Sequence, residues 1–256
     1  MSFTKMSIAK FEKFVGFSNF ATLFTDSRFI NALKLTIIFV ICATSIELCL
    51  GFCLALLLDR ESKIAKTARL LMMVPMMITP IVVGITWRLL YDTDYGLINY
   101  MLSKMNFKPV PWLASPSIAL FSLILVDTWQ WTPFMMLSIL AGLRSMPQEL
   151  YEAANIDGAG RLQSLLYITL PLLTPIILVA VLVRTIDVFK IFDIFFATTL
   201  GGPGTSTEIV SLLAFKIGFR YSHMGYAAAM VIIMLLITIL ICTLFIRVME
   251  KAGTSI

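Results

Sequence analysis

The sequence predicts an all-α membrane protein with about five transmembrane helices. Hydrophobic residues make up 59% of the 256-residue chain, charged residues make up 14%, and the mean hydropathy is +0.92. A soluble domain of this length cannot bury so much apolar surface, so the bilayer must act as its solvent. Apolar runs of about 20 residues, long enough to cross a bilayer as helices, recur along the chain. We therefore expect a multi-pass membrane protein with a single transmembrane domain at residues 31–250.

Five apolar runs predict the spans, at residues 35–58, 70–90, 117–143, 165–183 and 224–246. The second run contains Pro75, Pro80 and Gly84. This composition fits either an interrupted helix of the kind that flanks binding sites in transporters or a helix that is merely kinked. Both interpretations stay open at the level of the sequence.

The other segments are expected outside the bilayer. Residues 1–30 mix polar and aromatic residues and contain no apolar run long enough for a signal peptide, so we expect a surface or periplasmic segment. Residues 91–116 carry aromatic residues typical of an interfacial loop: Tyr91, Tyr95, Tyr100 and Trp112. Residues 208–222 are expected to form a short surface helix. After the fourth run, charges alternate in sign every three residues, as on a continuing helix: Arg184, Asp187, Lys190 and Asp193.

No residue pattern indicates catalysis, a metal site or nucleic-acid binding. The chain lacks the Gly-x4-Gly-Lys-Ser/Thr loop that holds ATP phosphates, and its net charge of +5 comes without a basic run. His223 has no nearby metal-ligand partner and is expected at the membrane interface. The four cysteines lie in apolar runs without a metal spacing and are expected to be small buried hydrophobic residues: Cys42, Cys49, Cys53 and Cys242.

A polar stretch at residues 144–165 separates the third and fourth runs and is too polar to cross a bilayer. Ser145 is expected to cap a helix there, with Gln148 three residues later, and Gly158 is expected to end it. A second short helix is expected from Arg161 until Pro171 interrupts it. The stretch therefore predicts a pair of short helices between two spans, suited to docking another protein.

The same stretch carries the motif Glu152-Ala153-Ala154, then Gly158, then Ile168-Thr169-Leu170-Pro171. This pattern, with every spacing intact, resembles the signature loop of permease subunits of bacterial ABC importers. Three further stretches resemble the carbohydrate branch of that family, the maltose and glycerol-phosphate type, and the resemblance runs from about Phe14 to about Arg247. The stretches are residues 94–97 with a later Asn99, residues 127–134, and residues 201–204.

The resemblance implies how the protein works. Members of the family have a core of five helices, usually preceded by one more, and this sequence begins after the usual first helix. The polar stretch would be a cytoplasmic coupling loop, an orientation that the lysine and arginine count does not favour and that rests on the resemblance. The implied location is the bacterial inner membrane. The residues implied in coupling to an ATPase are Glu152, Ala153, Ala154, Asp157, Gly158 and Pro171.

The implied partners are a second permease, a cytoplasmic ATPase dimer, an extracytoplasmic solute-binding protein and membrane lipid. This chain itself would bind no cofactor, since ATP and Mg²⁺ belong to the ATPase. It would therefore not be an enzyme, but the membrane subunit of an ATP-driven importer, for a sugar or a glycerol-phosphate-like solute.

One stripe of the third run is suited to a sugar. Asp127, Gln130, Trp131 and Phe134 fall at positions i, i+3, i+4 and i+7 of a helix. Carboxylate and amide groups bind hydroxyls, and aromatic rings cover the apolar faces of a sugar ring. The resemblance places sugar contacts on this stripe and on Ala180, Arg184 and Asp187.

Two alternatives apply to these polar residues and to the protein. Asp127 or Asp187 can instead form an internal salt bridge with Arg184, since paired charges are the usual form of charge inside a membrane. Glu47 is interpreted as a packing contact between subunits. The alternative function is a self-contained secondary carrier or channel, which should show an internal repeat. The sequence contains no such repeat, and the intramembrane stripe at residues 127–134 argues against a membrane scaffold without transport function.

Overall fold

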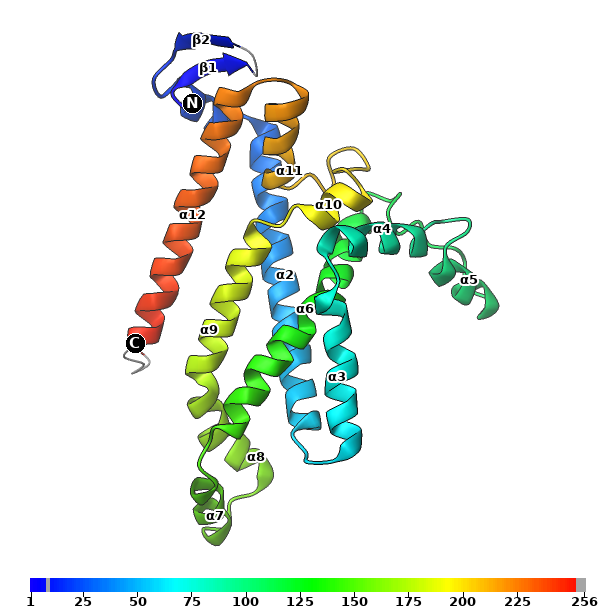
Figure 1. Ribbon diagram of the computed structural model, residues 1–256, viewed down its shortest axis with the longest axis vertical. Coiled ribbons are helices and arrows are strands. Elements are labelled where there is room, and N and C mark those ends of the chain that lie inside the picture. The colour runs from blue at the N-terminus through cyan, green and yellow to red at the C-terminus, as the bar shows by residue number, and fades with distance from the viewer. Residues whose placement is uncertain (8–9, 252–256) are drawn as a thin grey trace. The chain divides into compact units, whose positions relative to one another are not determined.

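The computed structural model describes residues 1–7 and 10–251, so residues 8 and 9 of the expected N-terminal segment lie outside the described residues. It is almost entirely helical, as predicted, with one short antiparallel strand pair before the first helix (Figure 1). In chain order the elements are β1 Thr4–Ser7, β2 Lys10–Phe14, α1 Ser18–Thr25, α2 Ser27–Leu58, α3 Lys63–Met77, α4 Pro80–Leu90, α5 Leu97–Lys104, α6 Ala119–Arg144, α7 Gln148–Ile156, α8 Arg161–Ser164, the π-helical turn η1 Leu165–Thr169, α9 Leu170–Phe189, α10 Asp193–Thr198, α11 Val210–Phe215, the π-helical turn η2 Lys216–Arg220 and α12 Met224–Lys251.

Four helical runs of the described chain are long and apolar enough to cross a membrane: Ser27–Leu58, Ala119–Arg144, Arg161–Thr198 and Met224–Glu250. A fifth is added if the bent pair of α3 and α4 counts as one span. The predicted number of about five spans is therefore confirmed.

The second span is interrupted rather than merely kinked. Helix α3 ends at Met77 and α4 begins at Pro80. Thr79 between them has an extended backbone, with φ −62° and ψ 137°. A residue that precedes proline is pushed out of the helical region by the proline ring, and proline itself is well placed in a first helical turn. The sequence Thr79-Pro80 thus ends one helix and starts the next, whereas Pro75 is accommodated inside α3.

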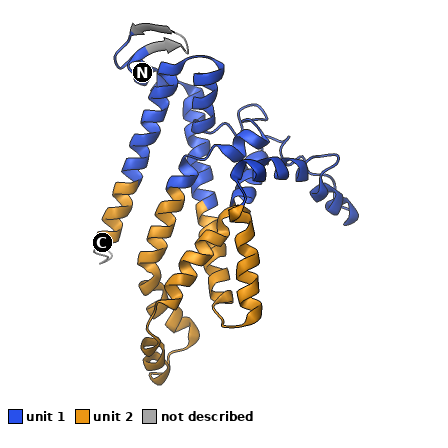
Figure 2. Ribbon diagram, in the orientation of Figure 1, with its two compact units in different colours: residues 1–43, 78–127, 186–241 blue, residues 44–77, 128–185, 242–256 orange. Residues whose placement is uncertain are grey.

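The described chain forms two compact units (Figure 2). The first contains residues 1–43, 78–127 and 186–241, and the second contains residues 44–77, 128–185 and those from 242 onward. Helices α2, α6, α9 and α12 contribute residues to both units.

The core of the first unit includes the segment expected to be a surface helix. Helix α11 and the turn η2 bury apolar residues against α1, α2 and α12, and the expectation of a surface position for residues 208–222 is wrong. Five of the six residues of α11 are apolar, and three of them are fully buried, which explains the difference. The shared core contains Leu23, Phe29, Ala32, Val210, Leu213, Ala214, Ile217, Ala227, Ala229, Met230 and Ile233.

The loop of residues 91–116, also in the first unit, is organised by a buried amide. The Asn99 side chain donates to the carbonyls of Thr93 and Val110 and accepts from the Val110 N–H and the Trp112 indole N–H. Tyr91 is 3% exposed and stacks on Trp112, so it is not the interfacial residue that was expected. Part of the loop is helical, as α5, and the Asn99 amide joins the chain before that helix to the chain after it.

In the second unit, α2, α3, α6 and α9 pack around a common apolar core. Gly51 permits a close approach of α2 and α6, since a Cβ added there would lie 2.6 Å from Cβ of Met135. Cys49 and Cys53, on the same helix, are exposed rather than buried as expected, because the apolar runs of a membrane protein also face lipid. The core contains Ala55, Leu58, Ala65, Met136, Ile139, Leu140 and Leu173.

The charge ladder does not lie on one continuing helix. Helix α9 ends at Phe189, and Asp193 lies in the first turn of the separate helix α10. Within the ladder, the Lys190 ammonium lies 3.0 Å from the Asp187 carboxylate. Lys190 to Phe192, between the two helices, are not helical.

Candidate functional site

The polar stretch between the spans forms an exposed helix, α7, closed by a glycine in the left-handed region. Gly158 has φ +78°. A residue with a Cβ is sterically strained at this φ, whereas glycine is not. The Asp157 N–H bonds to the Ala153 carbonyl, and the Ala159 N–H bonds to the Ala154 carbonyl. The prediction that Gly158 ends this helix is confirmed, and the turn that it makes leads directly into α8.

The residues expected to couple to an ATPase are mostly at the surface of this loop. Glu152, Ala153, Asp157 and Gly158 are exposed, whereas Ala154 is buried. Pro171 is exposed at the start of α9. The charge and the small side chain that we expect a partner to contact are therefore accessible, and the second alanine packs inside the chain.

Two local expectations for this stretch are wrong. Ser145 does not cap α7: its hydroxyl donates to the Gly142 carbonyl at 2.8 Å, and Pro147 occupies the N-cap position. Pro171 does not end the second helix, because α8, η1 and α9 follow one another without a break. A wide π-helical turn just before the proline relieves the clash between its ring and the carbonyl four residues earlier.

The sequence interpretation missed a group of apolar side chains on the same loop. Ile156, the last residue of α7, is 86% exposed, and Leu150 and Leu162 are exposed as well. Large apolar residues within an otherwise polar stretch were visible in the sequence and could have indicated a contact surface. Large apolar side chains at the surface of a polar segment are typical of a contact with another protein.

In the second unit, Arg184 of α9 is buried in a bidentate ion pair with Glu47 of α2. Nε of Arg184 lies 2.7 Å from Oε2 of Glu47, and Nη2 lies 2.9 Å from Oε1. The two side chains are 2% and 0% exposed. Trp131 of α6 covers the guanidinium, with Cζ of Arg184 4.8 Å from its ring centroid. Glu47 is thus an internal partner of Arg184, and its interpretation as a contact between subunits is wrong.

The predicted stripe lies on the continuous helix α6, and its polar members are buried. Gln130 and Asp127 are fully buried, while Trp131 and Phe134 are partly buried. Of the stripe, Trp131 contacts the buried ion pair through Arg184. Asp187 instead pairs with Lys190, in the first unit. Ala180 is buried on α9, one helical turn before Arg184. The role of these residues in binding a solute stays a prediction.

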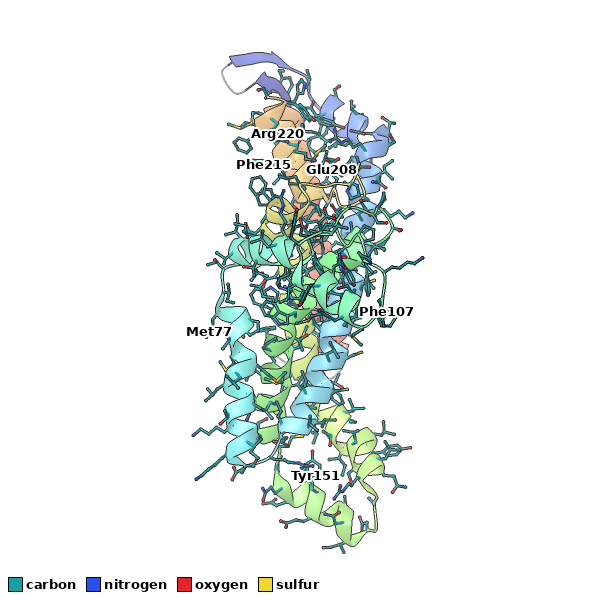
Figure 3. The ribbon with its side chains drawn as sticks, turned by 90° about the vertical axis from the view of Figure 1, so that its right-hand side faces the viewer. Met77, Phe107, Tyr151, Glu208, Phe215 and Arg220 are labelled. Atoms are coloured by element: carbon teal, nitrogen blue, oxygen red, sulfur yellow. The ribbon has the colours of Figure 1, made fainter. Side chains whose placement is uncertain are left out.

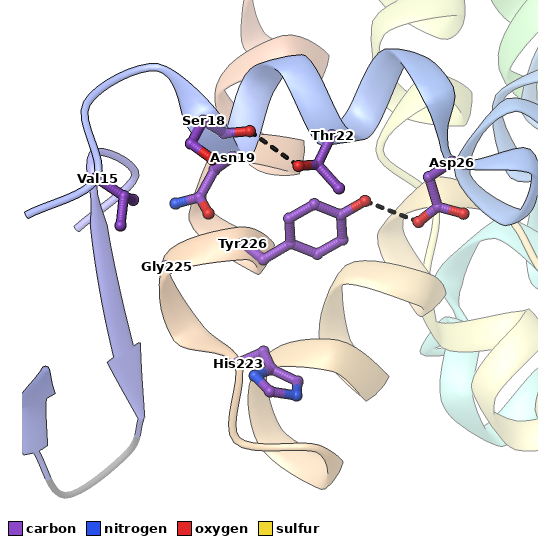
Figure 4. A pocket seen from close by; sticks show the side chains of 8 residues that line it. All are labelled: Val15, Ser18, Asn19, Thr22, Asp26, His223, Gly225 and Tyr226. Atoms are coloured by element: carbon purple, nitrogen blue, oxygen red, sulfur yellow. Dashed lines mark hydrogen bonds between the residues drawn. The ribbon is translucent and has the colours of Figure 1, made fainter. Parts of the chain in front are cut away.

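Two of the cavities formed by the described residues lie near the segments discussed above. One of about 720 Å³ adjoins α7 and is lined by Asp59, Glu61, Arg144, Tyr151, Glu152 and Thr169, among others. The other, of about 420 Å³, contains His223 and a Tyr226 hydroxyl that donates to Asp26 at 2.7 Å (Figure 4). Within the described ranges, no group of three His, Cys, Asp or Glu side chains is placed to hold a metal ion.

Comparison with known proteins identifies close relatives. Residues 47–252 match the family described as "Binding-protein-dependent transport system inner membrane component". The chain is 44% identical over 218 residues to the probable ABC transporter permease protein y4oQ of Sinorhizobium fredii, covering 85% of this chain and 70% of that protein. It is 41% identical over 212 residues to the trehalose/maltose transport system permease protein MalF of Thermococcus litoralis, covering 83% and 70%. It is 32% identical over 238 residues to the sulfoquinovosyl glycerol transport system permease protein SmoG of Agrobacterium fabrum, covering 93% and 77%.

Solved structures share the fold. A bacterial alginate ABC transporter, crystallised with an alginate pentasaccharide-bound periplasmic protein, matches with a TM-score of 0.85 and 24% identity over 94% of this chain and 85% of that chain. A second structure, of a bacterial ABC transporter involved in the import of the acidic polysaccharide alginate, matches with a TM-score of 0.81 and 25% identity, over 91% and 84%. These likenesses confirm the predicted all-α permease fold.

Proposed function

Since this chain belongs to the family of binding-protein-dependent transport system inner membrane components, we propose that it forms, with a second permease, the translocation path of an ATP-driven sugar importer. The chain is an ABC transporter permease, a multi-pass protein of the inner membrane. Its polar loop at residues 144–165 would lie in the cytoplasm, and residues 1–30 on the opposite side.

The proposed solute is a sugar. Two of the relatives are named for sugar transport, one for trehalose and maltose and one for sulfoquinovosyl glycerol. The stripe of Asp127, Gln130, Trp131 and Phe134 offers groups that bind hydroxyls beside aromatic faces. Arg184 and Asp187 of α9 would complete the path.

The proposed partners supply energy and solute. Two copies of a cytoplasmic ATPase, which bind ATP and Mg²⁺, would dock on the coupling loops of this chain and of the second permease. Glu152 and Asp157 would pair with basic groups of the ATPase, while the exposed Ala153 and Gly158 keep the approach free of bulk and the buried Ala154 packs beneath them. An extracytoplasmic binding protein would deliver the sugar, and closure of the ATPase dimer would move α7 and switch the spans between inward- and outward-facing states.

The observation that carries this proposal is an exposed helix, α7, held between two membrane spans by the left-handed Gly158. Gly158→Val is expected to lower ATP-dependent sugar uptake in proteoliposomes about tenfold or more, because a β-branched residue is strained at positive φ by about 1–3 kcal/mol. A Cβ at this position meets nothing within 4 Å, so the strain is local and the amount of protein in the membrane should not change.

Gly160→Ala is the matched control, since Gly160 lies two residues later and has an ordinary φ of −72°. Uptake by Gly158→Val equal to that of the unmodified protein would contradict the coupling role. Uptake by this chain alone, without ATP or partner proteins, would support the secondary carrier instead.

A further inference from the structure

Helix α7 is joined to the start of α9 by a side-chain hydrogen bond within the second unit. The Tyr151 hydroxyl lies 2.9 Å from Oγ1 of Thr169. Tyr151 is in the middle of α7 and is labelled in Figure 3, whereas Thr169 is the last residue of the turn η1. The contact joins residues 18 positions apart in sequence, across the whole of the intervening turn and α8.

The neighbouring carbonyl indicates which of the two hydroxyls donates the proton in this hydrogen bond. The Thr169 hydroxyl has one proton and lies 3.3 Å from the Ser164 carbonyl, which can only accept. When Thr169 donates to that carbonyl, Tyr151 must donate to Thr169. The sulfur of Met146, 3.1 Å from the Tyr151 hydroxyl, is the weaker alternative acceptor. The result is a chain of two hydrogen bonds from α7 through Thr169 to the backbone of Ser164.

Thr169 lies where the helix is least regular. In η1 the N–H of Leu170 bonds to the Leu165 carbonyl, five residues back instead of four. Two residues after Thr169, Pro171 has no N–H to donate. Single π-helical turns of this kind are uncommon and occur frequently at functional sites. The buried Thr169 hydroxyl thus makes its hydrogen bond to the Ser164 carbonyl within this irregular turn.

We propose that Tyr151 is a positioning residue for transport, whose hydrogen bond to Thr169 makes α7 and the start of α9 move together. With the bond in place, a displacement of α7 turns α9, and without it the turn at Gly158 and η1 absorbs the displacement. This inference rests on the proposed function, because it requires an ATPase that displaces α7.

The test uses the assembled importer in proteoliposomes, with the second permease, the ATPase and the binding protein. Sugar uptake and ATP hydrolysis are measured on the same vesicles, and the readout is sugar transported per ATP hydrolysed. Tyr151→Phe is expected to lower this ratio about 3- to 10-fold, the factor that corresponds to one hydrogen bond. Thr169→Val should lower it equally, and the double variant should lower it no further than either single variant.

Matched controls separate this link from a general effect on folding. Thr169→Ser keeps the hydroxyl and should keep the ratio of the unmodified importer. Tyr167→Phe changes a tyrosine of η1 that is 78% exposed. Thr174→Val changes a threonine of α9 whose hydroxyl donates to the Leu170 carbonyl of its own helix. Neither control should change the ratio.

The outcomes distinguish the inference from the proposed function. If the unmodified importer transports no sugar with ATP, the proposed function fails, whatever the variants do. If it does transport sugar and Tyr151→Phe keeps the same ratio, the positioning role is wrong. Uptake and hydrolysis that fall in equal proportion would also overturn the role, because they indicate loss of folded protein rather than loss of coupling.

Discussion

At the scale of single residues, the buried ion pair of Glu47 and Arg184 determines what the polar stripe can do. Charges inside a membrane protein persist when they are paired and hydrogen bonded, and both guanidinium bonds to Glu47 are short. The Trp131 ring adds a cation–π contact. Arg184 thus has a structural partner in addition to any role that it has in the sugar path.

Removal of one partner of this pair should be much more harmful than removal of both. Arg184→Met leaves the Glu47 carboxylate buried without its guanidinium, and we expect a loss of stability of about 3–5 kcal/mol. The double variant Arg184→Met with Glu47→Gln also removes the buried charge of Glu47 and should recover most of that loss. Thermal unfolding of the purified protein in detergent measures both effects.

The double variant also tests the role of Arg184 in the path. If Arg184 contacts sugar, the double variant should show a raised KM for uptake, although its Tm stays close to that of the unmodified protein. Unchanged KM would assign Arg184 a structural role only. An equally low Tm in the single and double variants would show that the loss of stability does not come from the Glu47 charge left buried.

At the scale of elements, the close approach of α2 and α6 depends on a small residue, Gly51. Gly51 brings α2 against α6 in the second unit, and an added Cβ would lie 2.9 Å from the backbone nitrogen of Met136. Backbone atoms of a membrane helix cannot move aside as the end of a flexible side chain can. Small residues are typical of such helix crossings in membranes.

Gly51→Leu should therefore separate the two helices and destabilise the second unit by about 3 kcal/mol, a cost typical of overpacking. Cys49→Leu is the matched control, because Cys49 is exposed and lies two residues earlier on the same helix. The Tm and the yield of monodisperse protein in detergent measure the effect. A Gly51→Leu variant as stable as Cys49→Leu would show that α2 and α6 are not in close contact.

At the scale of the whole molecule, long-range contacts join segments far apart in sequence. In the first unit, the carboxylate of Glu208, the residue labelled in Figure 3, is 1% exposed. It accepts hydrogen bonds from Arg28 and Lys216. Burial by itself would raise the pKa of Glu208, but the hydrogen bonds from the two cations outweigh burial and hold the pKa below its ordinary value of 4.5. The carboxylate therefore stabilises the folded state in its charged form.

This shift predicts the dependence of stability on pH. Since the pKa is lower in the folded state, the contribution of Glu208 is fully present above pH 4.5 and is lost as the pH falls through the lower folded value. The Tm should therefore fall on acidification below pH 4.5. Glu208→Gln should have a lower Tm at pH 7 and a smaller decrease on acidification. An equal decrease in both proteins would contradict the role of Glu208.

The number and position of the spans were predicted from the sequence because the bilayer requires long apolar helices, and composition records that requirement directly. The turn at Gly158 was predicted for a similar reason, since helix ends have local chemistry. The interrupted span was left open, because Pro75 and Pro80 are the same residue type, and only the extended backbone at Thr79 distinguishes a tolerated proline from one that follows a break.

Hydropathy and local motifs thus determined, from the sequence alone, the membrane class, the spans and the exposed loop. Tertiary structure decided which charged groups are paired: Glu47 with Arg184, 137 positions apart, and Glu208 with Arg28, 180 positions apart. It also decided that Tyr151 bonds to Thr169. Such contacts join side chains from different helices, and their partners depend on how those helices pack, which neither hydropathy nor helical spacing records.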